Sequence, residues 1–162
     1  MSKNLGKTFP VSITSLINRE NSDKKNSVIF FLTMDRGGYP HVAMLSPYQI
    51  CAVNEGSFIF SVYSSSSSCQ NLENEGKATF IIQADEGVYY VKCRSEQITP
   101  GPGREIGGHS IFISSDISIA FDHSEKAPIV SETLFLDSGV RESYMNEFKT
   151  LAGIAGDYLS RI

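Results

Sequence analysis

The chain has 162 residues, of which 41% are hydrophobic and 20% charged, and its formal net charge is −4. This length and composition predict one globular domain spanning residues 1–162. The negative charge argues against a nucleic-acid partner, which needs a basic face, and no apolar run approaches the ~20 residues that span a membrane.

The N-terminal part of the chain predicts a short helix followed by a β-hairpin. Residues 10–18 form the helix candidate, and Thr8 is placed to cap it. Residues 27–34 and 39–46 are rich in β-branched, aromatic and alternating apolar residues. The two glycines between these strands supply the positive φ that a tight hairpin turn needs.

The middle of the chain repeats this pattern. A second hairpin is predicted around the turn at residues 54–56, and a run of five serines leads into a short helix that Gly76 ends. The predicted strands of this region are residues 50–53, 57–63, 77–82 and 88–98, and the helix covers residues 69–75. Several short strands separated by turns indicate an antiparallel barrel or sandwich, in a mainly β (α+β) fold class.

The last third predicts two further strands and a C-terminal helix. The strands are residues 111–121 and 127–136, and apolar residues recur at helical spacing from Ser138 onward. Between residues 99 and 109 lies a Pro/Gly-rich loop that matches no phosphate-binding glycine motif, so we interpret it as a plain loop or a lid.

The serine run at residues 64–68 is the first candidate site. The first N–H groups of a helix lack internal partners, so serines and backbone amides at this point could bind a phosphate. The alternative, a solvated connector whose serines cap the helix, is favoured by the residues alone. Cys69 follows at the helix N-terminus, where a thiol pKa is lowered, although a packed small residue is the simpler interpretation.

Other chemistry is not indicated. Three widely spaced cysteines and three distant histidines predict neither a metal site nor a disulfide framework, and reduced thiols are typical of a cytoplasmic protein. The first 18 residues lack the apolar core of a secretory signal. No nucleophile has a base near it in sequence, so the catalytic residues are left unknown.

An ordered set of motifs resembles the pyridoxamine 5'-phosphate oxidase-like family of FMN-binding split barrels. The set spans residues 28–98, and no single motif in it is highly specific. It consists of a T-x-D-x-x-G-x-P hairpin, a strand with spaced phenylalanines, an Asn-Leu pair and a Lys-Ala strand start: Thr33, Asp35, Gly38 and Pro40, then Phe58, Phe60 and Ser61, then Asn71-Leu72 and Lys77-Ala78.

The resemblance implies an antiparallel split β-barrel with a few short peripheral helices and a C-terminal helix. It implies FMN as cofactor, a flavin-dependent oxidoreductase acting on an unknown small substrate, and a homodimer with the flavin at the interface. The implied cofactor-binding residues follow the isoalloxazine strand, the next strand and the phosphate turn: Ala43, Met44, Leu45, Ser46, Phe60, Ser61, Ser66, Ser67, Ser68 and Asn71.

This chain departs from the true oxidases of that family. Ser67 and Ser68 replace an Arg-Lys pair on the phosphate, and neutral hydroxyls cannot match charge-assisted contacts. Ala43 and Tyr48 stand where those enzymes use Arg and Lys, and Val88 stands where they use Gln. Two alternatives therefore stay open. The chain is a non-catalytic binding module, or it holds a deazaflavin or a haem, the haem ligated by one of three residues: His41, His109 or His123.

Overall fold

The computed structural model describes residues 2–18, 28–84, 87–123 and 141–161. Within these residues eight strands form one sheet, in which every pair is antiparallel. The strands are β1 (Lys3–Gly6), β2 (Ile29–Met34), β3 (Pro40–Leu45), β4 (Ile50–Asn54), β5 (Ser57–Tyr63), β6 (Lys77–Ala84), β7 (Gly87–Ile98) and β8 (His109–Asp122). The helices are α1 (Val11–Ile17), α2 (Ser67–Glu75) and α3 (Arg141–Leu159), with a 3₁₀ turn, η1 (Pro47–Gln49).

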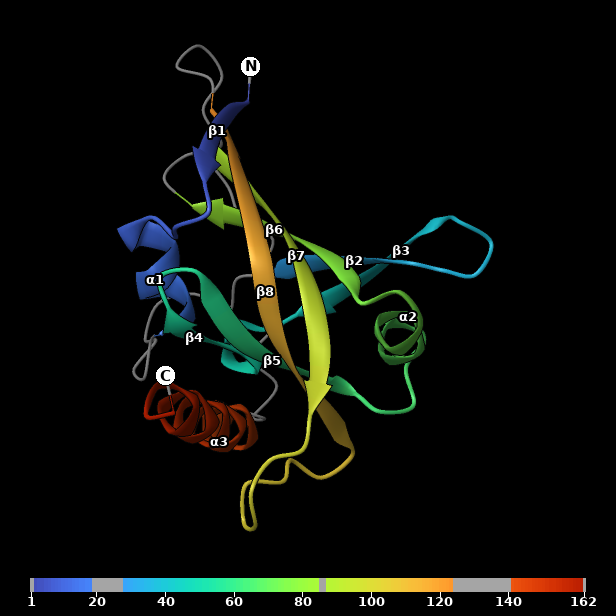
Figure 1. Cartoon of the computed structure of the whole chain (residues 1–162), viewed down its shortest axis with the longest axis vertical. Coiled ribbons are helices and arrows are strands. Elements are labelled where there is room, and N and C mark those ends of the chain that lie inside the picture. The colour runs from blue at the N-terminus through green and yellow to red at the C-terminus, as the bar shows by residue number, and fades with distance from the viewer. Residues whose placement is uncertain (1, 19–27, 85–86, 124–140, 162) are drawn as a thin grey trace.

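The sheet curls into a barrel that stays open along one side. The strand order is β3-β2-β6-β7-β8-β5-β4, with β1 added beside β8 (Figure 1). Phe31 on β2 and Phe60 on β5 are separated by three strands in this order, yet their ring centroids lie 5.6 Å from each other. Because β3 is hydrogen-bonded to neither β4 nor β5, the barrel is split on that side.

Aromatic side chains fill the barrel. The rings of Phe31, Phe58, Phe60 and Phe80 contact one another with centroids 4.9–5.8 Å apart, and each side chain is fully buried. These residues occupy alternate positions of their strands, so the period-2 pattern of the sequence places them all inside. The split-barrel fold class, with short helices and a C-terminal helix, is confirmed.

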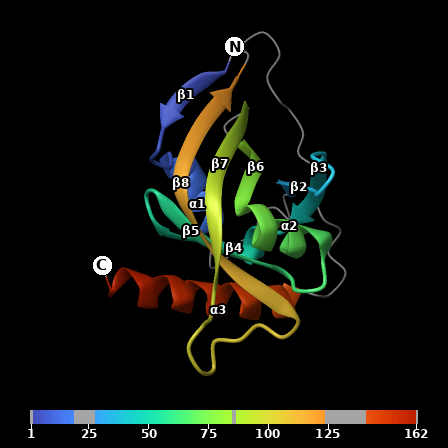
Figure 2. The same cartoon turned by 45° about the vertical axis from the view of Figure 1, so that its right-hand side comes forward.

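Helix α3 covers a second apolar cluster outside the barrel. Phe148, Leu151 and Ile154 of this helix pack with Ile59 of β5 and Ile111 of β8. Ile59 and Phe60 are neighbours in one strand and therefore point to opposite faces of the sheet. The helix lies across one end of the barrel, beneath β4 and β5 in the view of Figure 2.

The structure corrects one expectation, adds a strand that was not expected, and leaves one expectation outside the described residues. Thr8 does not cap α1, because Pro10 is the N-cap residue and no side chain bonds the helix end. Strand β1 was not predicted, since four residues without alternation give no strand signal. The strand expected at residues 127–136 lies outside the described residues. In the part of the chain that the structure describes, no helix is long and apolar enough to cross a membrane.

Candidate functional site

A pocket of about 270 Å³ lies in the split of the barrel. Its walls come from β3 and β5, which are not paired with each other, from the turn before α2, and from η1 and α3. Five of the ten predicted cofactor-binding residues line it: Ala43, Met44, Leu45, Ser66 and Ser68. The pocket therefore brings the predicted isoalloxazine strand and the predicted phosphate turn to one place.

One wall of the pocket is apolar. Phe31, Ala43, Leu45 and Val62 contribute it from three strands, and Phe31 is fully buried. Met44 points to the other face of β3 and is 57% exposed, so it forms the rim. An apolar wall with few convergent polar groups is typical of small-molecule sites and suits the face of a planar ring.

The opposite end of the pocket is the serine turn. Ser66 is the N-cap of α2, and its Oγ accepts from Cys69 N at 3.1 Å and donates to Tyr63 O at 2.7 Å. Both roles of this hydroxyl are therefore occupied, as in an ordinary helix cap. Ser68 is buried and borders the pocket. No lysine or arginine is among the described residues that line it.

The other five predicted residues do not line this pocket. Phe60 is in the barrel core, and Ser67 is exposed on the first turn of α2. Ser46 caps η1, Ser61 bonds to Glu147, and Asn71 donates from Nδ2 to Thr33 Oγ1 at 3.0 Å. Their contacts are structural ones that hold neighbouring elements together.

Three polar or aromatic residues of the pocket were missed by the sequence analysis. Gln49 lines it from η1, Tyr63 from the end of β5, and Tyr144 from α3. The ring of Tyr144 stacks on Tyr48 at 6.3 Å with an interplanar angle of 8°. The apolar spacing of α3 was visible in the sequence, but its docking position was not.

Behind the pocket lies a buried carboxylate, Glu147 of α3. Ser61 Oγ donates to Glu147 Oε1, and the side chain of Gln49 is also hydrogen-bonded to this carboxylate. His109 Nε2 lies 3.7 Å from Glu147 Oε1, and the two side chains are 11% and 8% exposed. Burial raises the pKa of Glu147, although the bond from Ser61 and the charge of His109 act in the opposite direction.

The cysteines do not behave as reactive thiols. Cys69 stands at the start of α2, but burial raises the pKa of its thiol instead of lowering it. Burial also raises the pKa of Cys93 to about 12. Among the described residues, no cluster of three or more His, Cys, Asp or Glu side chains could hold a metal ion.

The loop before β8 is docked on α3. Ile106 packs on the apolar cluster of α3, and Arg104 lies against Gly153 with its Nε 3.6 Å from Asp157 Oδ2. Gly153 leaves the space that the guanidinium occupies. The segment predicted as a plain loop or a lid is therefore in contact with α3 through Ile106 and Arg104.

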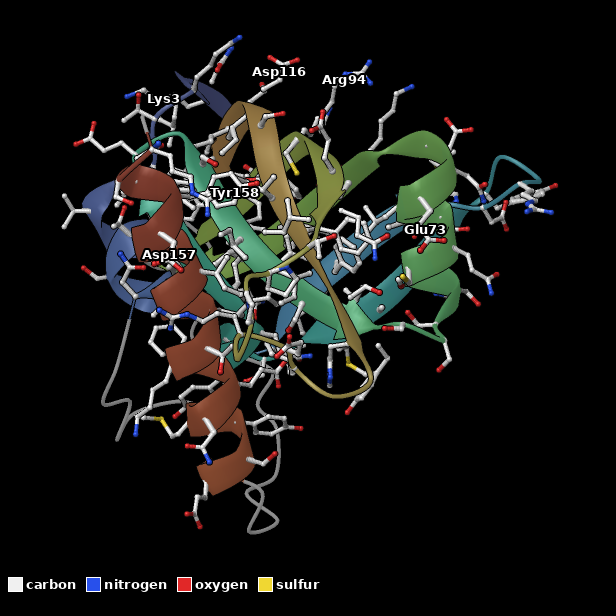
Figure 3. The ribbon with its side chains drawn as sticks, turned by 60° about the horizontal axis from the view of Figure 1, so that its bottom comes forward. Lys3, Glu73, Arg94, Asp116, Asp157 and Tyr158 are labelled. Atoms are coloured by element: carbon white, nitrogen blue, oxygen red, sulfur yellow. The ribbon has the colours of Figure 1, made fainter. Side chains whose placement is uncertain are left out.

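A second and larger pocket, of about 460 Å³, opens on the outer face of β2, β6 and β7. Lys77, Lys92 and Arg94 border it together with apolar residues of β2 and Asp116 of β8. Figure 3 shows Arg94 and Asp116 projecting from neighbouring strands at the same side of the sheet. None of the predicted cofactor-binding residues lines this pocket.

The chain matches no family model, and no curated protein matches its sequence. Solved structures are similar to it. A Lactobacillus delbrueckii protein with the provisional name pyridoxamine 5'-phosphate oxidase has a TM-score of 0.58 at 13% identity, over 74% of this chain and 99% of that one. An F420 reductase has a TM-score of 0.49 at 12% identity, over 70% and 98%. The haem storage protein HutZ of Vibrio cholerae has 0.45 at 10%, over 56% and 81%.

Proposed function

We propose that this chain, whose fold is the split barrel of the pyridoxamine 5'-phosphate oxidase-like proteins, binds a flavin nucleotide, FMN, in the pocket of the split. The observation that carries the proposal is the meeting of β3 residues 43–45 with the serine turn in one pocket. In this assignment the ring lies along Ala43 and Leu45, and the phosphate lies toward Ser66 and Ser68. Bound flavin would supply the redox chemistry, and the chain would orient it and exclude water.

The residues fit the two ends of FMN unequally. The apolar wall and Tyr144 suit the ring, because an aromatic face gains from stacking and from removal of water. The phosphate end offers the hydroxyl of Ser68 and the amides of the α2 N-terminus, which favour an anion. It offers no cation among the described lining residues, so ring contacts supply most of the affinity in this proposal.

A second copy of this chain completes the site in this proposal. The outer face of β2, β3, β6 and β7 carries apolar rows, in which Met44 pairs with Phe30, Phe30 with Ile81, and Ile81 with Tyr90. Val42 and Met44 on this face are 55% and 57% exposed. Because Met44 belongs both to this face and to the rim of the pocket, a partner copy on the face would close the pocket mouth.

The direct test is the absorption spectrum and thermal stability of the purified protein with and without added FMN. A bound flavin gives visible absorbance, and a ligand that binds only the folded state raises the unfolding temperature with concentration. A colourless protein whose unfolding temperature is unchanged by excess FMN would overturn the proposal.

The cation-free pocket favours one second candidate, a non-catalytic split-barrel module that does not hold the phosphate of FMN. Riboflavin separates the two candidates, because it carries the ring without the phosphate. Equal affinity for riboflavin and FMN would favour the module, and tighter binding of FMN would favour the nucleotide. None of the three histidines, which the structure describes, lines the pocket, so the haem alternative gains no support from this site.

A further inference from the structure

We propose that Gln49 is the residue that recognises the ligand in the split pocket, by presenting an amide N–H donor to the hydrogen-bond acceptor edge of a planar heterocycle. Glu147, Ser61 and His109 are its positioning residues. The inference rests on the proposed function, because the flavin ring is the heterocycle that the pocket would take, and it adds a specificity-determining residue that the motif resemblance does not contain.

The orientation of the Gln49 amide is determined by its partners. Gln49 Oε1 accepts from Ser46 N at 3.0 Å within the capping box of η1. A flipped amide would place two donors against each other, so the nitrogen must face the other way. There it donates to the carboxylate of Glu147. One hydrogen of Nε2 is used in this bond, and the second remains for a ligand, beside the hydroxyl groups of Ser68, Tyr63 and Tyr144 that also border the pocket.

Glu147 is held rigidly for this role. Ser61, which is fully buried on β5, donates to Glu147 Oε1. His109 Nδ1 lies 3.1 Å from the carbonyl oxygen of Gly107, so this nitrogen donates to that oxygen and Nε2 is the ring nitrogen left toward Glu147. This Nε2 atom is buried without a hydrogen-bond partner and faces Glu147 Oε1 at 3.7 Å.

Glu147 and His109 are connected to the pocket through two neighbouring side chains, those of Gln49 and Tyr63. Gln49 bonds to Glu147 and lines the pocket, and Tyr63 lines the pocket while its ring packs on His109 with centroids 4.3 Å apart. The groups facing Glu147 in the described structure are Ser61 on β5, His109 on β8 and Gln49 on η1, of which His109 is titratable. A buried amide donor beside an otherwise apolar wall selects a ligand with a carbonyl oxygen or ring nitrogen at that edge.

The test measures the affinity of FMN and of riboflavin, by quenching of flavin fluorescence, for the wild type and four variants. Gln49→Met keeps the length of the side chain and removes the donor. Glu147→Met removes the acceptor that positions Gln49, whereas Glu147→Gln keeps an acceptor oxygen. Gln97→Met is the matched control, because Gln97 is exposed on β7 and lines neither pocket.

We expect Gln49→Met and Glu147→Met to weaken the binding of FMN and of riboflavin by the same factor, about 5- to 10-fold, as for one lost neutral hydrogen bond. Glu147→Gln and Gln97→Met should stay within about twofold of the wild type. Rescue by Glu147→Gln distinguishes positioning from a merely structural role. If Gln49→Met does not fold, as judged by circular dichroism, the two Glu147 variants decide.

Each contrary outcome is informative. Binding of FMN to the wild type with unchanged affinity in folded Gln49→Met, or in Glu147→Met, overturns this inference and leaves the proposed function standing. A loss of affinity that is confined to FMN would mean that Gln49 contacts the phosphate and not the ring, and it overturns the ring assignment. No binding of either flavin to the wild type overturns the proposed function, and the inference with it.

Discussion

At the scale of single residues, Glu147 stands out as a carboxyl group buried between α3 and the barrel. It is a carboxylic acid on a helix, and the packing of α3 takes it out of water. Removal from water disfavours the charged form, and the donors Ser61 and Gln49 only partly offset this cost. The protonation of Glu147 therefore links the pH to the stability with which α3 packs on the barrel.

Replacing Glu147 by Gln should remove part of the pH dependence of stability. The folded-state pKa of Glu147 is raised, so its contribution is complete below the unfolded pKa of roughly 4.3 and is lost as the pH rises through the folded value. The free energy of unfolding of the wild type, measured by urea denaturation, should therefore fall relative to Glu147→Gln from about pH 4.3 upward.

Glu142→Gln is the matched control for this measurement, because Glu142 is an exposed glutamate on the same helix. Its stability should follow the wild type across the pH range. Parallel pH curves for the wild type and Glu147→Gln would show that Glu147 is not destabilised by burial.

The cysteines should be protected in the folded protein. Cys51, Cys69 and Cys93 are buried thiols that form no disulfide, and burial raises the pKa of Cys69 and of Cys93. Since the thiolate is the reactive form, labelling with a thiol reagent at pH 8 should be slow in the native state and complete in denaturant.

A cysteine introduced by Ser67→Cys gives the comparison for this labelling. Ser67 is exposed on the first turn of the same helix. The introduced thiol should react at least tenfold faster than the native ones, because it is accessible at a helix N-terminus. Native cysteines that react at the same rate would contradict the burial of Cys69.

At the scale of elements, α2 shows how a nine-residue helix is held at both ends. Ser66 caps its start, and Gly76 ends it in the left-handed conformation with φ of 61°. Gly76 N donates to Leu72 O at 2.8 Å, and Gly76 O accepts from Ser95 N at 2.7 Å. The end of the helix is therefore bonded directly to β7, which holds the serine turn against the pocket.

Gly76→Ala should destabilise the protein by about 1–2 kcal/mol, because an L-residue is strained in the left-handed region. A Cβ at this position would also lie 3.2 Å from the carbonyl oxygen of Ser95, which is backbone and cannot move freely. Urea unfolding of the variant and the wild type measures the difference.

Gly153→Ala is the contrasting substitution. Its Cβ would displace the flexible guanidinium of Arg104, with loss of a partly exposed ion pair to Asp157. The gain in helix propensity, about 1 kcal/mol, offsets that loss, so the stability should stay close to that of the wild type. Equal costs for the two glycines would show that the conformation of Gly76 is not what requires glycine.

At the scale of the whole molecule, the same strand, β3, borders the split of the barrel and contributes to the outer face of the sheet. The barrel closes on its phenylalanine core, while β3 remains unpaired on one side and leaves the pocket. The same strand exposes Val42 and Met44 on its outer face. Large exposed apolar side chains gathered on one face are typical of an interaction surface.

Val42→Asp should convert a homodimer into a monomer, because a charge within an apolar interface loses its water without a partner. The mass in solution, by light scattering after gel filtration, measures this. Val11→Asp is the control: Val11 is 81% exposed on α1, away from this face. A wild type that is monomeric at micromolar concentration would remove the second copy from the proposed site.

The sequence by itself determined the strands, the hairpin turns and the fold class. Alternation of apolar residues and the glycine turns are local signals, so β2 to β8 and α2 were predicted close to their observed bounds. The motif order also placed Ala43 to Leu45 and the serine turn in one predicted site. The prediction that Thr8 caps the first helix was wrong, because competing backbone contacts around Pro10 are not visible in a local pattern.

Only the tertiary structure decided what surrounds the pocket. Gln49, Ser61, His109 and Glu147 lie on η1, β5, β8 and α3, up to 98 positions apart, and no local pattern relates them. Their burial and hydrogen bonds arise when α3 docks across the end of the barrel. Cys69 shows the same difference between sequence and tertiary structure. Its position at a helix start could be predicted from the sequence, whereas the burial that raises its thiol pKa depends on packing by distant segments.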